Sequence, residues 1–169
     1  MKAITAILAV CSALWISVGC ASAQEEDSES GLALPRMVSL RSSLINARSG
    51  PGIRYPIEWV YQQKGAPVEI IEEFEFWRKI KDWEGSESWV HKTMLSGRRF
   101  VRVVNPGENN VYAKPDTQSK VVAKAEDGVV GEVEKCPQPQ EMCLIKFDTV
   151  HGWMKRDVLF GIYRDEVIK

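Results

Sequence analysis

The sequence predicts an all-β protein made of two small β-barrels in tandem, behind a cleaved signal peptide. Three observations lead to this prediction. Apolar and charged residues alternate along short segments, turn-forming residues separate these segments, and the order of segments and turns repeats once within the 169 residues. Alternation with a period of two places one face of a strand in a core. Strands of this length and spacing suit small barrels or two packed sheets.

The first half of the chain contains the clearest hairpin. Residues 77–81 alternate in polarity, residues 82–88 are rich in turn formers and include Gly85, and the apolar pair Trp89-Val90 begins the return strand. A single hairpin is marginal in water, so further strands must surround it. We expect them over residues 37–40, 43–47, 57–61 and 68–77, with a turn-dense loop at 48–52 and one tight helical turn at 92–95.

The same pattern then returns in the second half. Residues 111–115, 120–124, 127–133, 142–146 and 153–161 echo residues 46–51, 57–61, 64–71, 77–81 and 89–97, in that order. An internal duplication of this period indicates two similar units in series. We place them at residues 36–97 and 98–169. Domains of about sixty residues bury only about 60% of their unfolded surface, so we expect the two units to pack on each other.

The N-terminus has the pattern of a secretory signal peptide over residues 1–23. Lys2 precedes an almost wholly apolar run, residues 3–19, and the small residues Ala21-Ser22-Ala23 form a cleavage site. A transmembrane anchor is the alternative, but the apolar run is short of the roughly 20 residues that a span needs. We therefore expect the protein to be exported.

A lipoprotein signal is the alternative to a simple secretory signal peptide. Cys20 follows a stretch that resembles a bacterial lipoprotein box, although Ser17 stands where leucine is usual. Lipidation at Cys20 would make residues 24–31, the first part of the segment 24–35, a tether to a membrane. This segment begins with many acidic and no apolar side chains, so we expect a disordered linker.

Cys136 and Cys143 are the two cysteines beyond the signal peptide and Cys20. In an exported chain, an even pair favours a disulfide, here across the loop-like insert 137–142. A metal site is the alternative. Two thiols and the distant His91 and His151 lack the clustered spacing that zinc prefers, so we expect no metal and no cofactor.

Several of these segments together resemble a bacterial SH3 domain. They are Leu-Ile-Asn-Ala-Arg-Ser-Gly-Pro-Gly at 44–52, Gly-Ala-Pro-Val at 65–68, Trp-Arg-Lys-Ile at 77–80, and Gly85 followed by Trp-Val-His at 89–91. Residues 37–166 resemble the exported tandem SH3-like proteins of alphaproteobacteria, with Phe160-Gly161 where that family often has Trp-Gly. The resemblance implies two SH3-like barrels without a catalytic role. Related modules fused to cell-wall enzymes often bind peptidoglycan.

Four residues are candidates for ligand binding. Trp83 lies in a hairpin turn among charges and is the first candidate for an exposed recognition residue, followed by Trp59 and Tyr55. Exposed aromatic rings stack on sugar rings or peptide groups at low entropic cost. Alternatively, Trp83 merely covers the sheet edge. Arg48 either pairs with a ligand carboxylate or holds its own loop through carbonyl groups, and the second role is favoured.

No enzymatic motif is present in the sequence. A Gly-x-Ser-x-Gly elbow and a phosphate-binding glycine loop are absent. The acidic residues alternate along strands, so no catalytic carboxylate pair stands out. A cysteine nucleophile would need a free thiol, whereas the two cysteines are expected to be paired. The net charge of −1 predicts no nucleic-acid partner.

The sequence thus predicts a non-enzymatic binding protein of the cell envelope, located in the periplasm, that recognises peptidoglycan or an envelope peptide. The alternative is a periplasmic protein–protein adaptor or stability factor that binds through a sheet edge or an interdomain groove. A membrane partner is expected only if Cys20 is lipidated, which would make the protein an outer-membrane lipoprotein.

Overall fold

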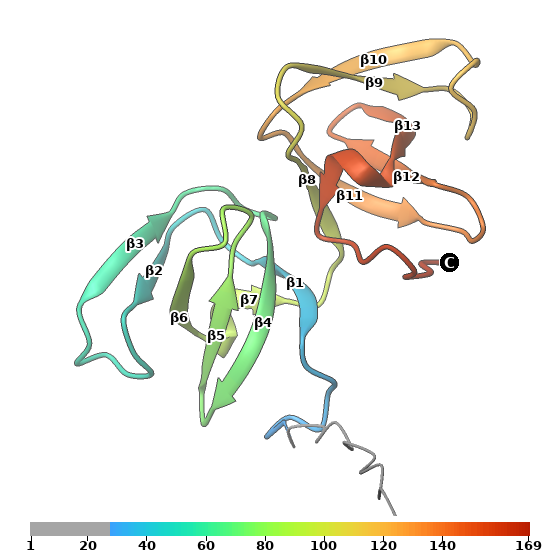
Figure 1. The fold of residues 1–169 in the computed structure, drawn as a ribbon. Coiled ribbons are helices and arrows are strands. Elements are labelled where there is room, and N and C mark those ends of the chain that lie inside the picture. Colours follow the sequence, from blue (N-terminus) through green and yellow to red (C-terminus); the bar gives the residue numbers. More distant parts are fainter. Residues whose placement is uncertain (1–27) are drawn as a thin grey trace, which may run out of the picture.

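The computed structural model describes residues 28–169 (Figure 1). The predicted signal peptide, Cys20 and the first part of the acidic segment lie outside these residues. Within the described range, no helix has the length and apolar character to cross a bilayer. The chain forms two curled antiparallel sheets that follow each other along the sequence, so the predicted all-β architecture is confirmed.

The first sheet contains seven strands in the order β3-β2-β6-β5-β4-β1-β7. They are β1 (Arg36–Leu40), β2 (Ile45–Arg48), β3 (Ile57–Tyr61), β4 (Pro67–Phe74), β5 (Trp77–Lys81), β6 (Glu87–His91) and β7 (Leu95–Ser96). The predicted helical turn is the 3₁₀ turn η1 (Lys92–Met94). The strand expected over 68–77 is shorter, because Glu75 has a φ of 49° and turns the chain after Phe74.

The second sheet repeats the first, strand for strand, in the order β10-β9-β13-β12-β11-β8-β14. Its elements are β8 (Phe100–Val103), β9 (Glu108–Tyr112), β10 (Val121–Glu126), β11 (Val130–Lys135), β12 (Met142–Phe147), β13 (Val150–Lys155), the 3₁₀ turn η2 (Arg156–Val158) and β14 (Leu159–Phe160). Each strand therefore has a counterpart seven positions earlier, and the predicted duplication is confirmed.

Each sheet curls around its own apolar core. Successive side chains of a strand point to opposite faces, so in β4 Val68 and Ile70 are buried while Glu69 between them is not. The first core consists of Val38, Leu40, Ile45, Ala47, Tyr61, Ala66, Val68, Ile70, Ile80, Val90 and Leu95. The second core is built in the same way, with buried residues from all seven strands of the second sheet.

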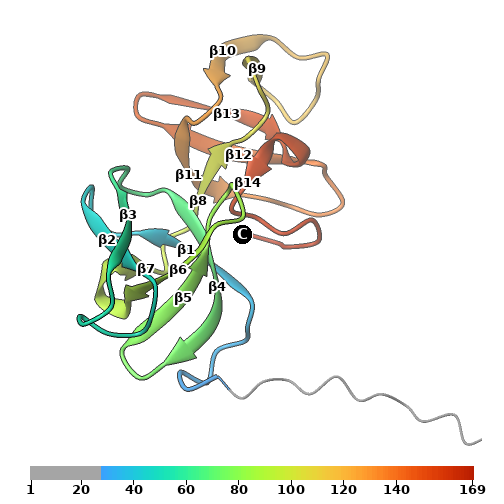
Figure 2. The same cartoon turned by 60° about the vertical axis from the view of Figure 1, so that its left-hand side comes forward.

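The two domains pack directly on each other. Figure 2 shows the second domain above the first, with the C-terminal end of the chain close to the junction. Gly161 has a φ of 110°, and a Cβ on it would stand 2.5 Å from the carbonyl oxygen of Phe100 and 2.7 Å from Pro67. Because neither backbone oxygen nor proline ring can move aside easily, this close approach requires glycine.

Hydrogen bonds also cross the junction. Arg102 Nη1 donates to Gln63 Oε1 at 2.7 Å, and Gln63 Nε2 donates to the carbonyl oxygen of Gly128 at 3.1 Å. On the C-terminal segment, the Tyr163 hydroxyl donates to Glu69 Oε1 at 2.8 Å. The expected packing of the two halves is therefore present, and it combines apolar contact with specific polar pairs.

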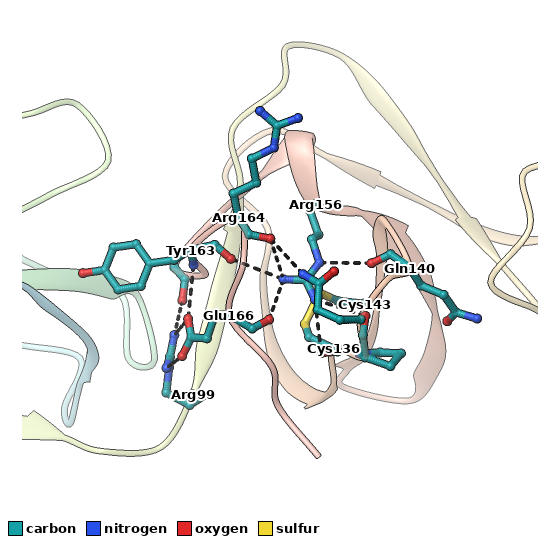
Figure 3. Close-up of a disulfide and its surroundings, with 11 residues drawn as sticks. Arg99, Cys136, Gln140, Cys143, Arg156, Tyr163, Arg164 and Glu166 are labelled. Carbon is teal, nitrogen blue, oxygen red and sulfur yellow. Dashed lines mark hydrogen bonds and ion pairs between the residues drawn. A yellow bond between two sulfur atoms is a disulfide. The ribbon is translucent and has the colours of Figure 1, made fainter.

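The disulfide between Cys136 and Cys143 is present, with both residues fully buried. Beside the disulfide lies the buried side chain of Arg156 (Figure 3). Its guanidinium connects two segments: the loop closed by the disulfide and the C-terminal segment of the chain. It donates to six carbonyl oxygens: three from the disulfide loop (Cys136, Pro137 and Gln140) and three from the C-terminal segment (Tyr163, Arg164 and Glu166).

A second buried charge cluster holds the beginning of the described chain and the end of β4. The carboxylate of Glu73, 1% exposed, accepts from Arg36 Nη2 at 2.5 Å and from Arg78 Nε at 3.0 Å. The backbone N–H and the hydroxyl of Ser30 also donate to it, at 2.7 and 2.8 Å. Ser30, from the segment expected to be a linker, thus lies against the first domain.

Arg156→Met is expected to lower the free energy of unfolding by about 3–5 kcal/mol, because it leaves a set of buried carbonyl groups without their charged donor. Arg156→Lys should cost less, since an ammonium group keeps the charge and has three donors. Urea unfolding followed by tryptophan fluorescence measures both. The control Arg164→Met removes an exposed side chain and should change stability by less than about 0.5 kcal/mol. Equal stability of Arg156→Met and the control would contradict this role.

Glu73 predicts a specific pH dependence of stability. Burial opposes its ionisation, but hydrogen bonds from Arg36 and Ser30 outweigh burial and hold its pKa below the ordinary value of 4.5. A carboxylate with a lowered pKa in the folded state stabilises the fold above its unfolded pKa and loses this contribution as the pH falls through the folded pKa.

The stability advantage of the native protein over Glu73→Gln should therefore be complete at about pH 6 and shrink steadily below about pH 4.5. Denaturant titrations at several pH values measure it. Glu72→Gln, at the exposed neighbouring position, serves as the control and should show little effect at any pH. An advantage of Glu73 that stays constant from pH 6 to pH 3 would refute the assignment.

Candidate ligand-binding groove

The loop between β2 and β3, residues 49–56, is held in place by Arg48. Its Nη1 atom donates to the carbonyl oxygens of Ile53 at 3.1 Å and Tyr55 at 2.7 Å. The Tyr55 ring lies over Gly50, where a Cβ would come within 2.5 Å of it. Arg48 and Tyr55 thus shape the loop, in agreement with the structural role favoured for Arg48.

The turn between β4 and β5 is equally well fixed. Glu75 adopts the left-handed backbone region, which costs a residue with a Cβ roughly 1–2 kcal/mol. Arg78, itself buried, offsets this cost by donating from Nη1 to the carbonyl oxygens of Glu75 at 3.0 Å and Trp77 at 2.7 Å. The turn carries Phe74 and Phe76 outward on either side of Glu75.

The loop and the turn form the two walls of a groove of about 580 Å³. One wall is lined by residues 51–54, and the other by residues 74–77 and His91. This volume lies within the range of about 300–1,000 Å³ that is typical of ligand sites. Both walls are hydrogen-bonded in place by buried or half-buried arginines, so the groove exists before any ligand binds.

The groove combines apolar surface with charged side chains, and Lys92 lies beside its lining. Ile53, Phe76 and Phe74 are 83%, 57% and 46% exposed, which is unusual for such side chains. Phe76 stacks on the ring of His91, with the centroids 6.2 Å apart, and Lys92 Nζ lies 4.7 Å from the Phe76 centroid.

Arg54 adds a second cation, since its guanidinium lies 5.3 Å from the Tyr55 ring in the same loop. Glu75 is the one carboxylate among the residues lining the groove. Chemically, the groove can stack on flat or ring-shaped groups and pair with a carboxylate. In residues 28–169 no three His, Cys, Asp or Glu side chains gather as a metal site would require.

Trp83 does not take the exposed position expected of it. It is half-buried, its indole Nε1 is shielded from solvent, and it packs edge-on against Tyr61 with the centroids 6.0 Å apart. The guanidinium of Arg102 lies 4.2 Å from its ring centroid. Arg102 belongs to the second domain, so the exposure predicted from the first domain's hairpin is wrong. Trp83 is part of the domain junction and lies outside the groove.

The other three predicted residues are distributed around the groove rather than within its lining. Arg48 and Tyr55 support the loop from behind. Trp59 is 52% exposed, as expected, but stands on the edge strand β3. The structure therefore brings Arg48 and Tyr55 together, places Trp59 opposite Ala47 on the neighbouring strand, and leaves Trp83 apart at the domain junction.

Sequence reasoning missed Phe74 and Phe76, the main aromatic surface of the groove. The signal was available, because both flank Glu75 in the acidic stretch Glu-Glu-Phe-Glu-Phe. An aromatic residue among charges next to a turn was the argument applied to Trp83, and it applies equally to these two phenylalanines.

The second domain has a groove at the equivalent place, between the β9–β10 loop and the β11–β12 loop. Its volume is about 450 Å³, and it has no aromatic residue among those that line it, which are Pro115, Asp116, Thr117, Gln140, Glu141, Met142, Lys155 and Asp157. One wall is the loop closed by the disulfide and bound by Arg156. The two grooves thus share a location and differ in chemistry.

Comparison with solved structures finds distant likenesses. NlpC2 from Trichomonas vaginalis is 14% identical with a TM-score of 0.36, over 78% of this chain and 50% of that chain. NlpC1 from the same organism is 16% identical with a TM-score of 0.33, over 83% and 50%. The chain spans about half the length of these structures, and likenesses at this level carry no functional argument. No match was found among curated proteins.

A family comparison is more specific. The model of the bacterial SH3 domain family matches residues 41–97 and, separately, residues 105–161. Each match covers six of the seven strands of one sheet, beginning after β1 and after β8, and the two together cover more than half of the sequence. With both halves matched and both folded with the same strand order, the chain belongs to the bacterial SH3 domain family, as a tandem of two such domains.

Proposed function

We propose that this protein binds peptidoglycan or a cell-envelope peptide through the groove of its first domain, without catalysing a reaction. The observation that carries the proposal is the exposed aromatic surface of Phe74 and Phe76 on a turn fixed by Arg78. Large exposed apolar side chains that gather at a preformed groove are typical of binding sites.

The chemistry of the groove fits this class of ligand. Ring faces such as that of Phe76 stack on sugar rings and peptide groups. Arg54 and Lys92 supply positive charge for carboxylates such as those of peptide stems. Because Arg48 and Arg78 hold both walls in advance, binding loses little conformational entropy at the groove.

Binding without chemistry agrees with the side chains present. The two cysteines of the described chain are joined in a disulfide, so neither supplies a nucleophilic thiol there. His91, the histidine at the groove, shares its Nδ1 with the Thr93 hydroxyl at 2.8 Å and stacks on Phe76. These contacts give His91 a role in shaping the aromatic wall.

We infer a periplasmic location from the signal-peptide pattern of residues 1–23 together with the buried disulfide, which is stable in an oxidising compartment. An outer-membrane lipoprotein anchored at Cys20 is the alternative location. Either one places the groove next to the cell wall.

The adaptor function remains a second candidate because of one observation. The edge strand β3 exposes Ile57, Trp59 and Val60, at 46%, 52% and 45%. An unprotected edge with apolar side chains can accept a strand from another protein. This surface is separate from the groove lining, so the two functions can be tested with different variants.

Phe76→Ala should weaken co-sedimentation with purified peptidoglycan sacculi by at least about tenfold, since a central aromatic anchor contributes on the order of 2 kcal/mol to binding. Trp59→Ala is the matched control. It removes an aromatic side chain of similar exposure outside the groove lining and should pellet as the native protein does.

Saturable pelleting lost only in Phe76→Ala supports the groove. Absence of pelleting by the native protein at moderate salt would overturn peptidoglycan as the ligand. Loss of a crosslinked protein partner in Trp59→Ala, with Phe76→Ala unaffected, would instead favour the adaptor. Circular dichroism and thermal unfolding confirm that each variant is folded.

A further inference from the structure

A third cleft lies at the domain junction, apart from both grooves. It has a volume of about 190 Å³ and is formed by the end of β1, the turn before β4 and the linker between the domains. A water molecule needs roughly 10–15 Å³ of such space, and extended ligands use about 300 Å³ or more. The cleft therefore has room for one small group with a few waters.

Three cations from three different segments line this cleft: Arg41, Lys64 and Arg98. Arg98 is engaged by Glu132, with Nη2 2.7 Å from Oε2. Among residues 28–169, neither Arg41 nor Lys64 forms an ion pair. The cleft thus carries excess positive charge, although the whole chain has a net charge of −1.

The backbone around the cleft presents these cations in a defined way. Arg41 Nε donates to the carbonyl oxygen of Leu95 at 3.1 Å, which orients the guanidinium and leaves its two terminal nitrogens for another acceptor. Lys64 precedes Gly65, which has a φ of 82°. A Cβ added to Gly65 would lie 3.1 Å from the Phe100 ring of the second domain. The turn that carries Lys64 is therefore fixed against the second domain.

We propose that this interdomain cleft binds a phosphate group. The Arg41 guanidinium has the planar fork that suits phosphate oxygens, and Lys64 supplies a compact second charge. Arg98, shared with Glu132, contributes a third. A bound phosphate would connect the first domain, through Arg41 and Lys64, to the linker, through Arg98, and would stabilise the junction.

The phosphate group can belong to a soluble phosphate ester or to a lipid headgroup, and the chemistry of recognition is the same. Exposed cations act in water and are screened, so a single cation binds phosphate weakly. Affinity therefore requires at least two of the three, and removal of one should have a measurable effect. The site does not depend on the aromatic groove of the first domain.

The test is thermal unfolding of the purified protein in sodium phosphate against sodium chloride at equal ionic strength. We expect a saturable rise in Tm with phosphate. Lys64→Gln should raise the phosphate concentration for half of this effect at least fivefold, and Lys64→Arg should retain the native response. Lys120→Gln is the matched control, since Lys120 is also exposed and forms no ion pair within residues 28–169. No phosphate effect, or equal effects of Lys64→Gln and Lys120→Gln, would overturn the proposal.

Flotation with vesicles then identifies the source of the phosphate. Binding to phosphatidylglycerol–phosphatidylcholine vesicles that is competed by inorganic phosphate and lost in Lys64→Gln assigns the site to an anionic headgroup. Phosphate stabilisation without vesicle binding assigns it to a soluble ester. Vesicle binding that survives in Lys64→Gln would exclude this cleft as the membrane contact. Phe76→Ala, which tests the groove, should leave the phosphate response unchanged.

Discussion

The contact between the two domains is the interaction on which the rest of the structure depends. A domain of about sixty residues buries too little apolar surface to be more than marginally stable. Here Val130 of the second domain packs against the first core, and Arg102 covers the Trp83 ring. Neither half is complete alone, because part of each domain's shielding comes from the other. The interdomain cleft exists only because the halves meet in this way.

The two domains share their strand order but differ in the residues that line their grooves. Both domains have the same order of seven strands, and both have a groove between the same two connections. In the first domain, arginine-to-carbonyl bonds hold an aromatic turn. In the second, a disulfide and Arg156 hold a polar loop. A short strand framework therefore tolerates exchange of the residues that meet a ligand, provided that each loop keeps a buried anchor.

The sequence was sufficient for the fold because alternation, turns and duplication can be read locally along the chain. The Arg48 loop follows from its turn residues, and the disulfide follows from an even cysteine pair in a chain with a signal-peptide pattern. Trp83 was misplaced because its cover, Arg102, comes from the other domain. Phe74 was missed because the register shifts between Ile70 and Glu72, so alternation before that point does not predict orientation after it. Phe76 was missed because the predicted strand ran on to residue 77, whereas the chain turns at Glu75. Neither interdomain contacts nor β-bulges can be predicted from the alternation of apolar and polar residues.

The packed junction has one more consequence, because it sets the distance between the aromatic groove of the first domain and the groove of the second domain, where carboxylates outnumber cations. For a polymer long enough to reach both, the second contact is intramolecular, and its effective concentration depends on that distance rather than on the amount of ligand in solution. If both grooves bind, this arrangement would favour chains in which two chemically different groups recur at a matching interval. Tandem duplication thereby adds a fixed spacing between two grooves, by which ligands of different repeat length could be distinguished.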